Sequence, residues 1–272
     1  MRVITVVDVG INHNADLDIA RKLIDVAALA GVDYVKFQKR TPELCVPDAQ
    51  KNVLRETPWG AMTYLEYRHR MEFGKKEYLQ LADYCEKRRI KFFFSVWDEE
   101  SVDFVRAFDC DFIKIPSACL TDSSIVAKLD GGDRVIASSG MSDWALLDNV
   151  DINPEYLLHC VSTYPSTPEE QNLRAITNMK DRYPMTKIGF SNHFPGVLYI
   201  PIAVALGAEM VEWHITLDRA MWGTDQAASI EPEGTFKIVK YINSTEKAMG
   251  NGEKVIFDRE VPIMQKLRRC VG

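Results

Sequence analysis

Residues 187–216 read KIGFSNHFPGVLYIPIAVALGAEMVEWHIT, and this stretch decides the fold. The apolar run at 187–192 predicts a strand, the amphipathic run at 196–206 predicts a helix, and 210–216 predicts a second strand. Strands that alternate with helices in this way form βαβ units, whose strands are parallel. Because the same unit recurs along the chain, the number of units decides the architecture.

Eight such units are expected in the 272 residues. The strands are expected at 3–10, 33–38, 90–97, 111–117, 134–140, 156–163, 187–192 and 210–216. The helices are expected at 17–30, 76–89, 99–107, 122–129, 143–149, 170–183, 196–206 and 233–248. A single barrel needs roughly 250 residues, so the sequence predicts one (β/α)8 TIM barrel of the α/β class. We expect the barrel at 1–250, and a tail at 251–272 that packs on the barrel or extends from it.

The composition is that of an ordinary folded domain. Hydrophobic residues make up 46% of the chain and charged residues 26%, a balance that supplies a sizeable core and excludes disorder. The net charge is -6 and the basic residues form no long run, which excludes a nucleic-acid-binding surface. The six cysteines lack CxxC spacing, so we expect reduced thiols. With no signal peptide and no run of ~20 apolar residues, a soluble, cytoplasmic protein that contacts no membrane is expected.

Polar side chains gather at the carboxyl ends of the predicted strands. A TIM barrel carries its active site at this end, so the position of these residues predicts a catalytic face. They are Asp8, Lys36, Gln38, Ser95, Lys114, Ser117, Ser139, Ser162, Tyr164, Ser191, His193 and His214. A long insertion at 40–75 separates the second strand from its helix, and loops of that length are usually functional.

Two histidines end the last two strands, His193 in GFSNH and His214 in VEWHIT. Two neutral imidazoles from adjacent strands make half of a divalent metal site, in which the metal would act as a Lewis acid toward a carbonyl oxygen. The alternative is that each histidine only caps its strand by hydrogen bonding.

Lys36 and Lys114 lie near the ends of apolar strands, where an ammonium group needs an anionic partner. A phosphate or carboxylate ligand would supply that partner, with the strand-end serines as further hydrogen-bond donors. The alternative is that each lysine pairs with a carboxylate of the barrel. Asp8, and Asp225 in the loop after the last strand, are candidates for handling protons or a sugar hydroxyl, or else cap a helix or a turn.

Taken together, a set of segments resembles the barrel domain of the N-acetylneuraminate (sialic acid) synthase family nearly from end to end. The segments are VGINHN (9–14), DYVKFQK (33–39), TPWGAMTYLEYRHRMEF (57–73), FFSVWDEESVDF (93–104), FIKIPSACLTD (112–122), SSGMS (138–142), LLHCVSTYP (157–165), IGFSNH (188–193) and VEWHITLDRAMWGTDQAASIEP (211–232).

The resemblance implies a metal-dependent transferase. In this reaction C3 of phosphoenolpyruvate attacks the aldehyde of an N-acetylmannosamine-like aldose, which gives a 2-keto-3-deoxy sugar acid and phosphate. It implies that His193 and His214 bind a divalent metal ion, which is manganese (Mn2+) or alternatively Mg2+ or Co2+. It implies that phosphoenolpyruvate is held by Lys36, Lys114, Gln38, Ser95, Ser117, Ser139, Ser162 and Ser191. Asp8 then stands at the position of an acidic residue proposed for proton transfer, Tyr164 and Asp225 stand where sugar contacts are expected, and a homodimer is implied.

The chain departs from the family pattern at several positions. Asp8 stands where the family usually has Glu, Val96 where a Thr is common, Cys119 where many members have an acidic residue, and Trp213 where a basic residue is frequent. The chain also stops before the antifreeze-like domain of full-length members. Three alternatives follow: the insertion closes the sugar site, a separate chain completes it, or the substrate differs.

Two rival hypotheses stay open on the residues alone. One is a barrel that binds a phosphorylated or sugar ligand without turning it over. The other is a different metal-dependent barrel, such as an aldolase or sugar epimerase, which would use the two histidines but not phosphoenolpyruvate.

Overall fold

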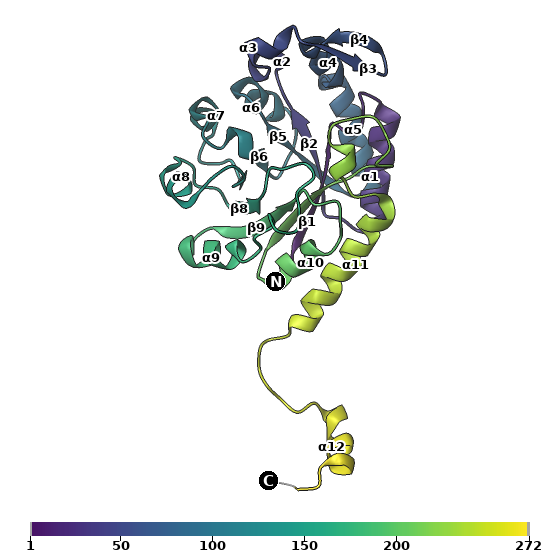
Figure 1. The fold of residues 1–272 in the computed structure, drawn as a ribbon, viewed down its shortest axis with the longest axis vertical. Helices are drawn as coiled ribbons and strands as arrows, with labels where there is room; N and C mark the ends of the chain where they lie inside the picture. Colours follow the sequence, from purple (N-terminus) through teal and green to yellow (C-terminus); the bar gives the residue numbers. More distant parts are fainter. Residues whose placement is uncertain (1, 271–272) are drawn as a thin grey trace.

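The computed structural model describes residues 2–270 and confirms the TIM barrel. Eight parallel strands close in the order β1-β10-β9-β8-β7-β6-β5-β2, and helices surround them (Figure 1). The barrel strands are β1 (Ile4–Gly10), β2 (Tyr34–Lys39), β5 (Lys91–Val96), β6 (Ile113–Ile115), β7 (Val135–Ser138), β8 (Tyr156–Cys160), β9 (Lys187–Asn192) and β10 (Met210–His214).

The helices that follow the strands match the predicted alternation. They are α1 (Leu17–Ala30), α5 (Lys75–Arg88), α6 (Glu99–Val105), α7 (Ser123–Lys128), α8 (Trp144–Asn149), α9 (Ala175–Arg182), α10 (Tyr199–Ala205) and α11 (Pro232–Met249). The first helix shows how the sequence sets such bounds. The Asp16 side chain caps its N-terminus, and Gly31 ends it in the left-handed conformation (φ 81°) that glycine adopts most easily. Ala20, Leu23 and Ala27 form the face that packs on the sheet.

Four strands, β6, β7, β8 and β10, end two or three residues earlier than predicted, and two helices, α9 and α10, begin five and three residues later. The strand predicted at 156–163 (β8) ends at Cys160, and the strand predicted at 111–117 (β6) ends at Ile115. Pro116 and a short 3-10 turn, η1 (Ser117–Cys119), stop β6 because proline has no N–H to extend the ladder. The shortened ends leave their polar residues in loops on the carboxyl face.

Strand register brings distant residues to one level of the barrel. Asp8 pairs with His214 on β10 and with Lys36 on β2. On the following strands, Gln38 pairs with Ser95, and Ser95 pairs with Lys114. The polar strand ends therefore converge on one place.

The insertion at 40–75 folds over the carboxyl face near β1 and β2 (Figure 1). It contains two short helices, α2 (Pro42–Cys45) and α3 (Asp48–Lys51), a hairpin of β3 (Leu54–Thr57) and β4 (Gly60–Thr63), and α4 (Tyr64–Met71). Thr63 and Glu66 form a capping box at the start of α4. The buried residues Tyr67 and Met71 pack with Ile11 of the loop after β1, which fixes the insertion beside the barrel mouth.

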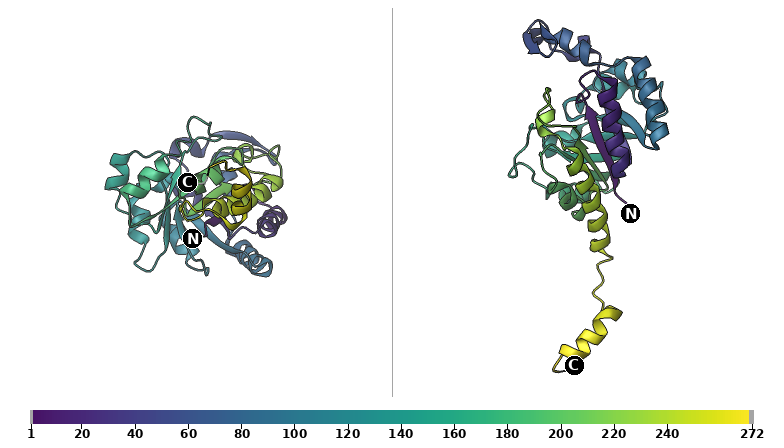
Figure 2. Two further views of the ribbon diagram at one scale, coloured as in Figure 1. Left: turned by 90° about the horizontal axis from the view of Figure 1, so that it is seen from below. Right: turned by 90° about the vertical axis from the view of Figure 1, so that its right-hand side faces the viewer.

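The C-terminal segment extends away from the barrel (Figures 1 and 2). Past α11 the chain forms a single 3-10 turn, η3 (Asp258–Glu260), and α12 (Val261–Leu267). Apolar side chains here, among them Phe257 and Leu267, are exposed. Across residues 2–270 we find no helix with the length and hydropathy that crossing a bilayer requires.

Candidate active site

One cavity at the carboxyl end of the barrel brings most of the predicted residues together. The cavity has a volume of about 170 Å3. The predicted residues that line it are Asp8, Lys36, Gln38, Ser95, Lys114, Ser117, Ser162, Tyr164, Ser191, His193 and His214. Ser139 and Asp225 are not among the lining residues.

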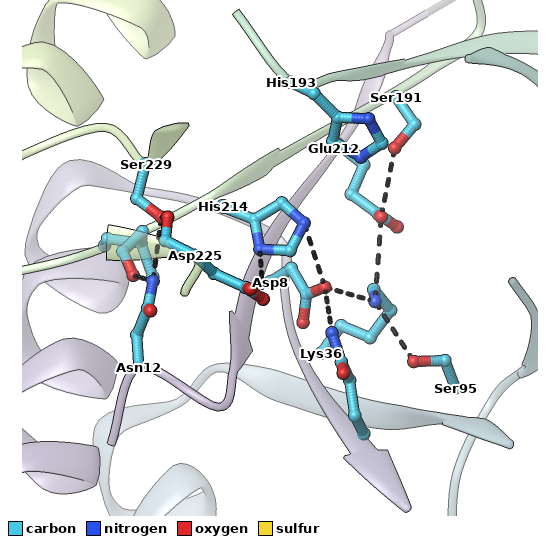
Figure 3. Close-up of polar contacts among 12 residues, drawn as sticks. Asp8, Asn12, Lys36, Ser95, Ser191, His193, Glu212, His214, Asp225 and Ser229 are labelled. Carbon is cyan, nitrogen blue, oxygen red and sulfur yellow. Dashed lines mark hydrogen bonds and ion pairs between the residues drawn. The ribbon is translucent and has the colours of Figure 1, made fainter. Parts of the chain in front are cut away.

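A buried network of four charged groups, Asp8, Lys36, Lys114 and Glu212, lines this cavity. Figure 3 shows Asp8, Lys36 and Glu212 of this network. Lys36 Nζ lies 2.6 Å from Asp8 Oδ2, and Lys114 Nζ lies 2.8 Å from both carboxylate oxygens of Glu212. Lys36 also lies 3.7 Å from Glu212. All four side chains are 2 to 3% exposed. With two positive and two negative groups, the network is neutral and its members are shielded from solvent.

Burial and mutual attraction compete in setting the pKa values of these groups. Burial favours the neutral form of Asp8, but Lys36 and His214 outweigh it and hold the Asp8 pKa below its usual value. The pKa of Glu212 is lowered in the same way, because the attraction of Lys114 and Lys36 outweighs burial. The pKa of Lys36 is raised, since two carboxylates outweigh burial, whereas burial prevails at Lys114 and lowers its pKa. Lys114 is therefore the less well compensated ammonium group.

His193 is held in one tautomer. Its Nδ1 lies 2.5 Å from the Val161 carbonyl oxygen, which can only accept, so Nδ1 carries the proton. In the neutral imidazole, Nε2 then has a lone pair that accepts from the Tyr164 hydroxyl at 2.8 Å. A histidine whose Nδ1 donates to a backbone carbonyl is the usual arrangement of a metal ligand.

His214 faces His193 across the cavity, with ring centroids 5.4 Å apart. His214 Nε2 lies 3.6 Å from Asp8 Oδ2, and Nδ1 lies 3.8 Å from Asp225 Oδ2. Nδ1 has no hydrogen-bond partner within the described chain, although it is buried. Burial lowers the pKa of His214 and thereby favours the neutral form that binds metals.

The two imidazoles would supply two ligands of a metal ion. Among residues 2–270, no group of three or more His, Cys, Asp or Glu side chains is arranged to hold a metal ion. Water and substrate oxygens would have to fill the other positions, as they do in catalytic sites with open coordination.

Two predicted residues need correction or qualification. Ser139 was expected in the cavity, but its hydroxyl donates to the Leu158 carbonyl oxygen, and Ser138 lines the cavity instead. The reason is the pleat, because successive side chains of a strand point to opposite faces. Asp225 lies directly before η2 (Gln226–Ala228), with Oδ2 3.8 Å from His214 Nδ1, and is not among the residues that line the cavity.

Other cavity residues were missed by sequence reasoning. Glu212 precedes His214 by two positions, so strand alternation places both on the same face, and this was the available signal. Trp97 and Cys160 also line the cavity. In SSGMS, a Cβ on Gly140 would lie 2.7 Å from Ser117 Oγ, and the Gly140 N–H donates to that oxygen at 3.0 Å. Glycine therefore leaves room beside the Ser117 hydroxyl.

Comparisons with known proteins identify relatives of this chain. The model of the NeuB family matches residues 23–254. The chain is 33% identical to N-acetylneuraminate-9-phosphate synthase of Homo sapiens, over 98% of this chain and 76% of the relative. It is 32% identical to N,N'-diacetyllegionaminic acid synthase of Campylobacter jejuni, over 93% of this chain and 79% of that protein.

Solved structures show the same likeness. The N-acetylneuraminic acid synthetase of Leptospira borgpetersenii, solved in complex with citrate, superposes with a TM-score of 0.85 at 30% identity, covering 99% of this chain and 94% of that one. The spore coat polysaccharide biosynthesis protein SpsE of Bacillus subtilis gives a TM-score of 0.77 at 28% identity, covering 95% of this chain and 72% of that one.

Proposed function

The chain belongs to the NeuB family and is a sialic acid synthase-like transferase, and we propose that it condenses phosphoenolpyruvate with an N-acetylated aldose. The product is a 2-keto-3-deoxy sugar acid of the sialic acid type, and inorganic phosphate is released. The single observation that carries this proposal is the pairing, in one cavity, of two buried ammonium groups with two facing imidazoles.

The ammonium groups suit the anionic substrate. Phosphoenolpyruvate carries a phosphate and a carboxylate, and buried Lys36 and Lys114 supply charge-assisted hydrogen bonds to such groups. Ser95, whose hydroxyl is 3.2 Å from Lys36 Nζ, and the space beside Ser117 and Gly140 extend this anion site. Ser138 takes the part first expected of Ser139.

The imidazoles suit a divalent cation, for which we propose manganese, with Mg2+ or Co2+ as substitutes. When bound to His193 and His214, the cation would supply Lewis-acid polarisation of the aldehyde oxygen. His193 is prepared for this by its Nδ1–H donation to Val161, and the Tyr164 hydroxyl would have to release Nε2. Tyr164 is then free to contact the sugar.

The buried charged residues of the cavity also take part in proton transfer. The reaction joins C3 of phosphoenolpyruvate to the aldehyde carbon, consumes a water at C2, protonates the aldehyde oxygen and breaks the bond to phosphate. Asp8 is ionised, so it orients a water or hydroxyl by accepting a hydrogen bond from it. We assign proton donation to a lysine ammonium, of which Lys114, with its lowered pKa, is the better suited.

The proposal is tested by phosphate release from phosphoenolpyruvate with manganese and a panel of N-acetylated and plain aldoses. We expect release only when an aldose and the metal are both present, and loss of release in His214→Ala. His69→Ala is the matched control, because His69 lies exposed in the insertion and pairs with Glu43. No release with any aldose, despite thermal stabilisation by phosphoenolpyruvate, would favour a non-catalytic binding barrel. Metal binding with no response to phosphoenolpyruvate would favour another metal-dependent aldolase or epimerase.

A further inference from the structure

The loop after β10, residues 217–229, begins and ends beside one of the two facing histidines. The Ile230 N–H, directly after the loop, donates to the His214 carbonyl oxygen at 2.8 Å. The Ile230 carbonyl oxygen accepts from the Thr216 N–H at 3.0 Å, so the two ends of the loop are held together like a short pair of parallel strands. With its ends fixed in this way, the position of the outer part of the loop is set by its other contacts.

Asp225 is the carboxylate of this loop that faces His214. Its Oδ2 lies 3.8 Å from His214 Nδ1 (Figure 3), a buried nitrogen that has no hydrogen-bond partner within residues 2–270. Its Oδ1 accepts from the Thr224 hydroxyl at 2.8 Å. The distance to Nδ1 is about 1 Å too long for a hydrogen bond, so a small displacement of the loop decides whether one forms. A hydrogen bond there makes Nδ1 the donor and leaves the Nε2 lone pair for a metal ion.

Trp222, three residues before Asp225, docks the loop on the insertion. Its ring makes edge-to-face contacts with Trp59, at a centroid distance of 5.7 Å, and with Tyr67, at 5.4 Å. Aromatic rings prefer this geometry because the positive edge of one ring meets the negative face of the other. The Trp222 carbonyl oxygen also accepts from the Asn14 side-chain amide at 2.9 Å. The outer part of the loop is thus held both by the insertion and by the loop after β1.

The insertion gives this contact a firm support. Tyr67 is 2% exposed and belongs to a buried apolar cluster that joins the insertion to the loop after β1. Trp59 lies in the turn of the β3–β4 hairpin, where the Arg70 guanidinium lies 4.5 Å from the centre of its ring. Trp222, Trp59 and Tyr67 are not among the residues that line the cavity. These three rings therefore influence the cavity only through the residues that they hold in place.

We propose that Trp222 is a positioning residue for the metal ligand His214. Docked on the two aromatic rings of the insertion, it holds Asp225 close enough for the carboxylate to fix the His214 imidazole. The insertion thereby determines, from outside the cavity, how tightly the cation is held. This inference rests on the proposed function, because it takes His214 as a ligand of the divalent cation.

The first test measures manganese binding by isothermal titration calorimetry in the wild type, Trp222→Ala and Trp222→Phe. Trp222→Ala should bind manganese about 10- to 100-fold more weakly, the loss that follows when the contact orienting a metal-bound histidine is removed. Trp222→Phe keeps an aromatic ring for the edge-to-face contacts and should recover most of the affinity. Trp144→Ala is the matched control, because Trp144 is 38% exposed, against 37% for Trp222, and lies on another loop of the barrel, at the start of α8. Its affinity for manganese should stay that of the wild type.

A second test asks whether Trp222 acts through Asp225. Asp225→Ala should weaken manganese binding by a similar factor, and adding Trp222→Ala to it should cost little more, because both changes remove one contact. Hydrogen exchange of the amides in 217–229 should be faster in Trp222→Ala than in the wild type and unchanged in Trp144→Ala. The manganese concentration that gives half of the maximal rate should rise in Trp222→Ala, whereas kcat at saturating manganese should change less. A variant that had only misfolded would lose kcat at every manganese concentration.

Manganese binding and condensation are measured separately, so the two proposals can fail separately. Equal manganese affinity in Trp222→Ala and the wild type, or equal losses in Trp222→Ala and Trp144→Ala, would overturn the inference while condensation stands. Losses that multiply in the double variant with Asp225→Ala would do the same. Absence of condensation, with manganese binding that still depends on Trp222, would overturn the proposed reaction and leave the inference standing. A wild type that binds no manganese would overturn the proposed metal site and the inference together.

Discussion

Glu212→Gln removes one negative charge from the buried network while keeping the shape of the side chain. In the native protein both Glu212 oxygens accept from Lys114 at 2.8 Å, Oε1 accepts from Ser191 at 3.2 Å, and Lys36 lies 3.7 Å away. The substitution leaves two buried ammonium groups to share the single carboxylate of Asp8. Removing one partner of a buried ion pair costs about 3–5 kcal/mol, because the charge that remains stays desolvated.

For a chain of this size, such a loss lowers the midpoint of thermal unfolding by roughly 10 °C. The matched control is Glu155→Gln. Glu155 also accepts from two cations, Arg134 at 2.7 Å and Lys187 at 2.9 Å, but its side chain is 26% exposed. We expect that control to lose less than about 1 kcal/mol, because solvent screens its ion pairs.

The assay is thermal and urea unfolding followed by circular dichroism, with and without phosphoenolpyruvate. Glu212→Gln should also gain more stability from phosphoenolpyruvate than the wild type does, because its lysines lack a competing carboxylate. Equal midpoints for Glu212→Gln and Glu155→Gln would refute the account of a buried, charge-balanced network. A smaller gain in thermal stability from phosphoenolpyruvate in Glu212→Gln than in the wild type would also refute it.

Three further predictions follow from individual contacts. Tyr164→Phe removes the hydroxyl that occupies His193 Nε2, so calorimetry should show manganese binding that is about 2- to 10-fold tighter, and weaker binding would contradict this reading. Gly140→Ala places a Cβ against Ser162 Oγ and 2.7 Å from Ser117 Oγ, so the KM for phosphoenolpyruvate should rise. The free energy of unfolding should fall by about 1–3 kcal/mol, and an unchanged KM would remove both serines from the anion site. Burial lowers the pKa of His13 to about 3, below the 6.5 of an exposed histidine, so between these values only the unfolded chain binds the proton. His13 should therefore contribute a fall of about 1.4 kcal/mol per pH unit to the free energy of unfolding as pH drops from 6.5 toward 3. The fall should be shallower by that amount in His13→Gln, and an equally steep fall would contradict the assignment.

The barrel itself could be predicted because its evidence is local. Each strand and helix leaves its own periodic pattern, and parallel closure brings all carboxyl ends to one face. Asp8, Lys36 and His214 were therefore found from position alone, and strand register explains why they meet.

Other parts of the site depend on contacts that sequence patterns do not report. Glu212 was passed over because its importance comes from Lys114, which is 98 positions away in the chain. Ser139 was chosen over Ser138 because β7 is buried at every position, so the apolar pattern does not show which face turns inward.

The most direct test of the central claim is to follow the carbon atoms of phosphoenolpyruvate. Isotopically labelled phosphoenolpyruvate, manganese and the preferred aldose are incubated with the wild type and with His214→Ala, and the products are identified by mass spectrometry. The account predicts one labelled acid that contains all three phosphoenolpyruvate carbons joined to the intact aldose chain, formed in equal amount with phosphate and absent in the variant. Labelled pyruvate as the sole product, or phosphate release that does not need the aldose, would contradict it.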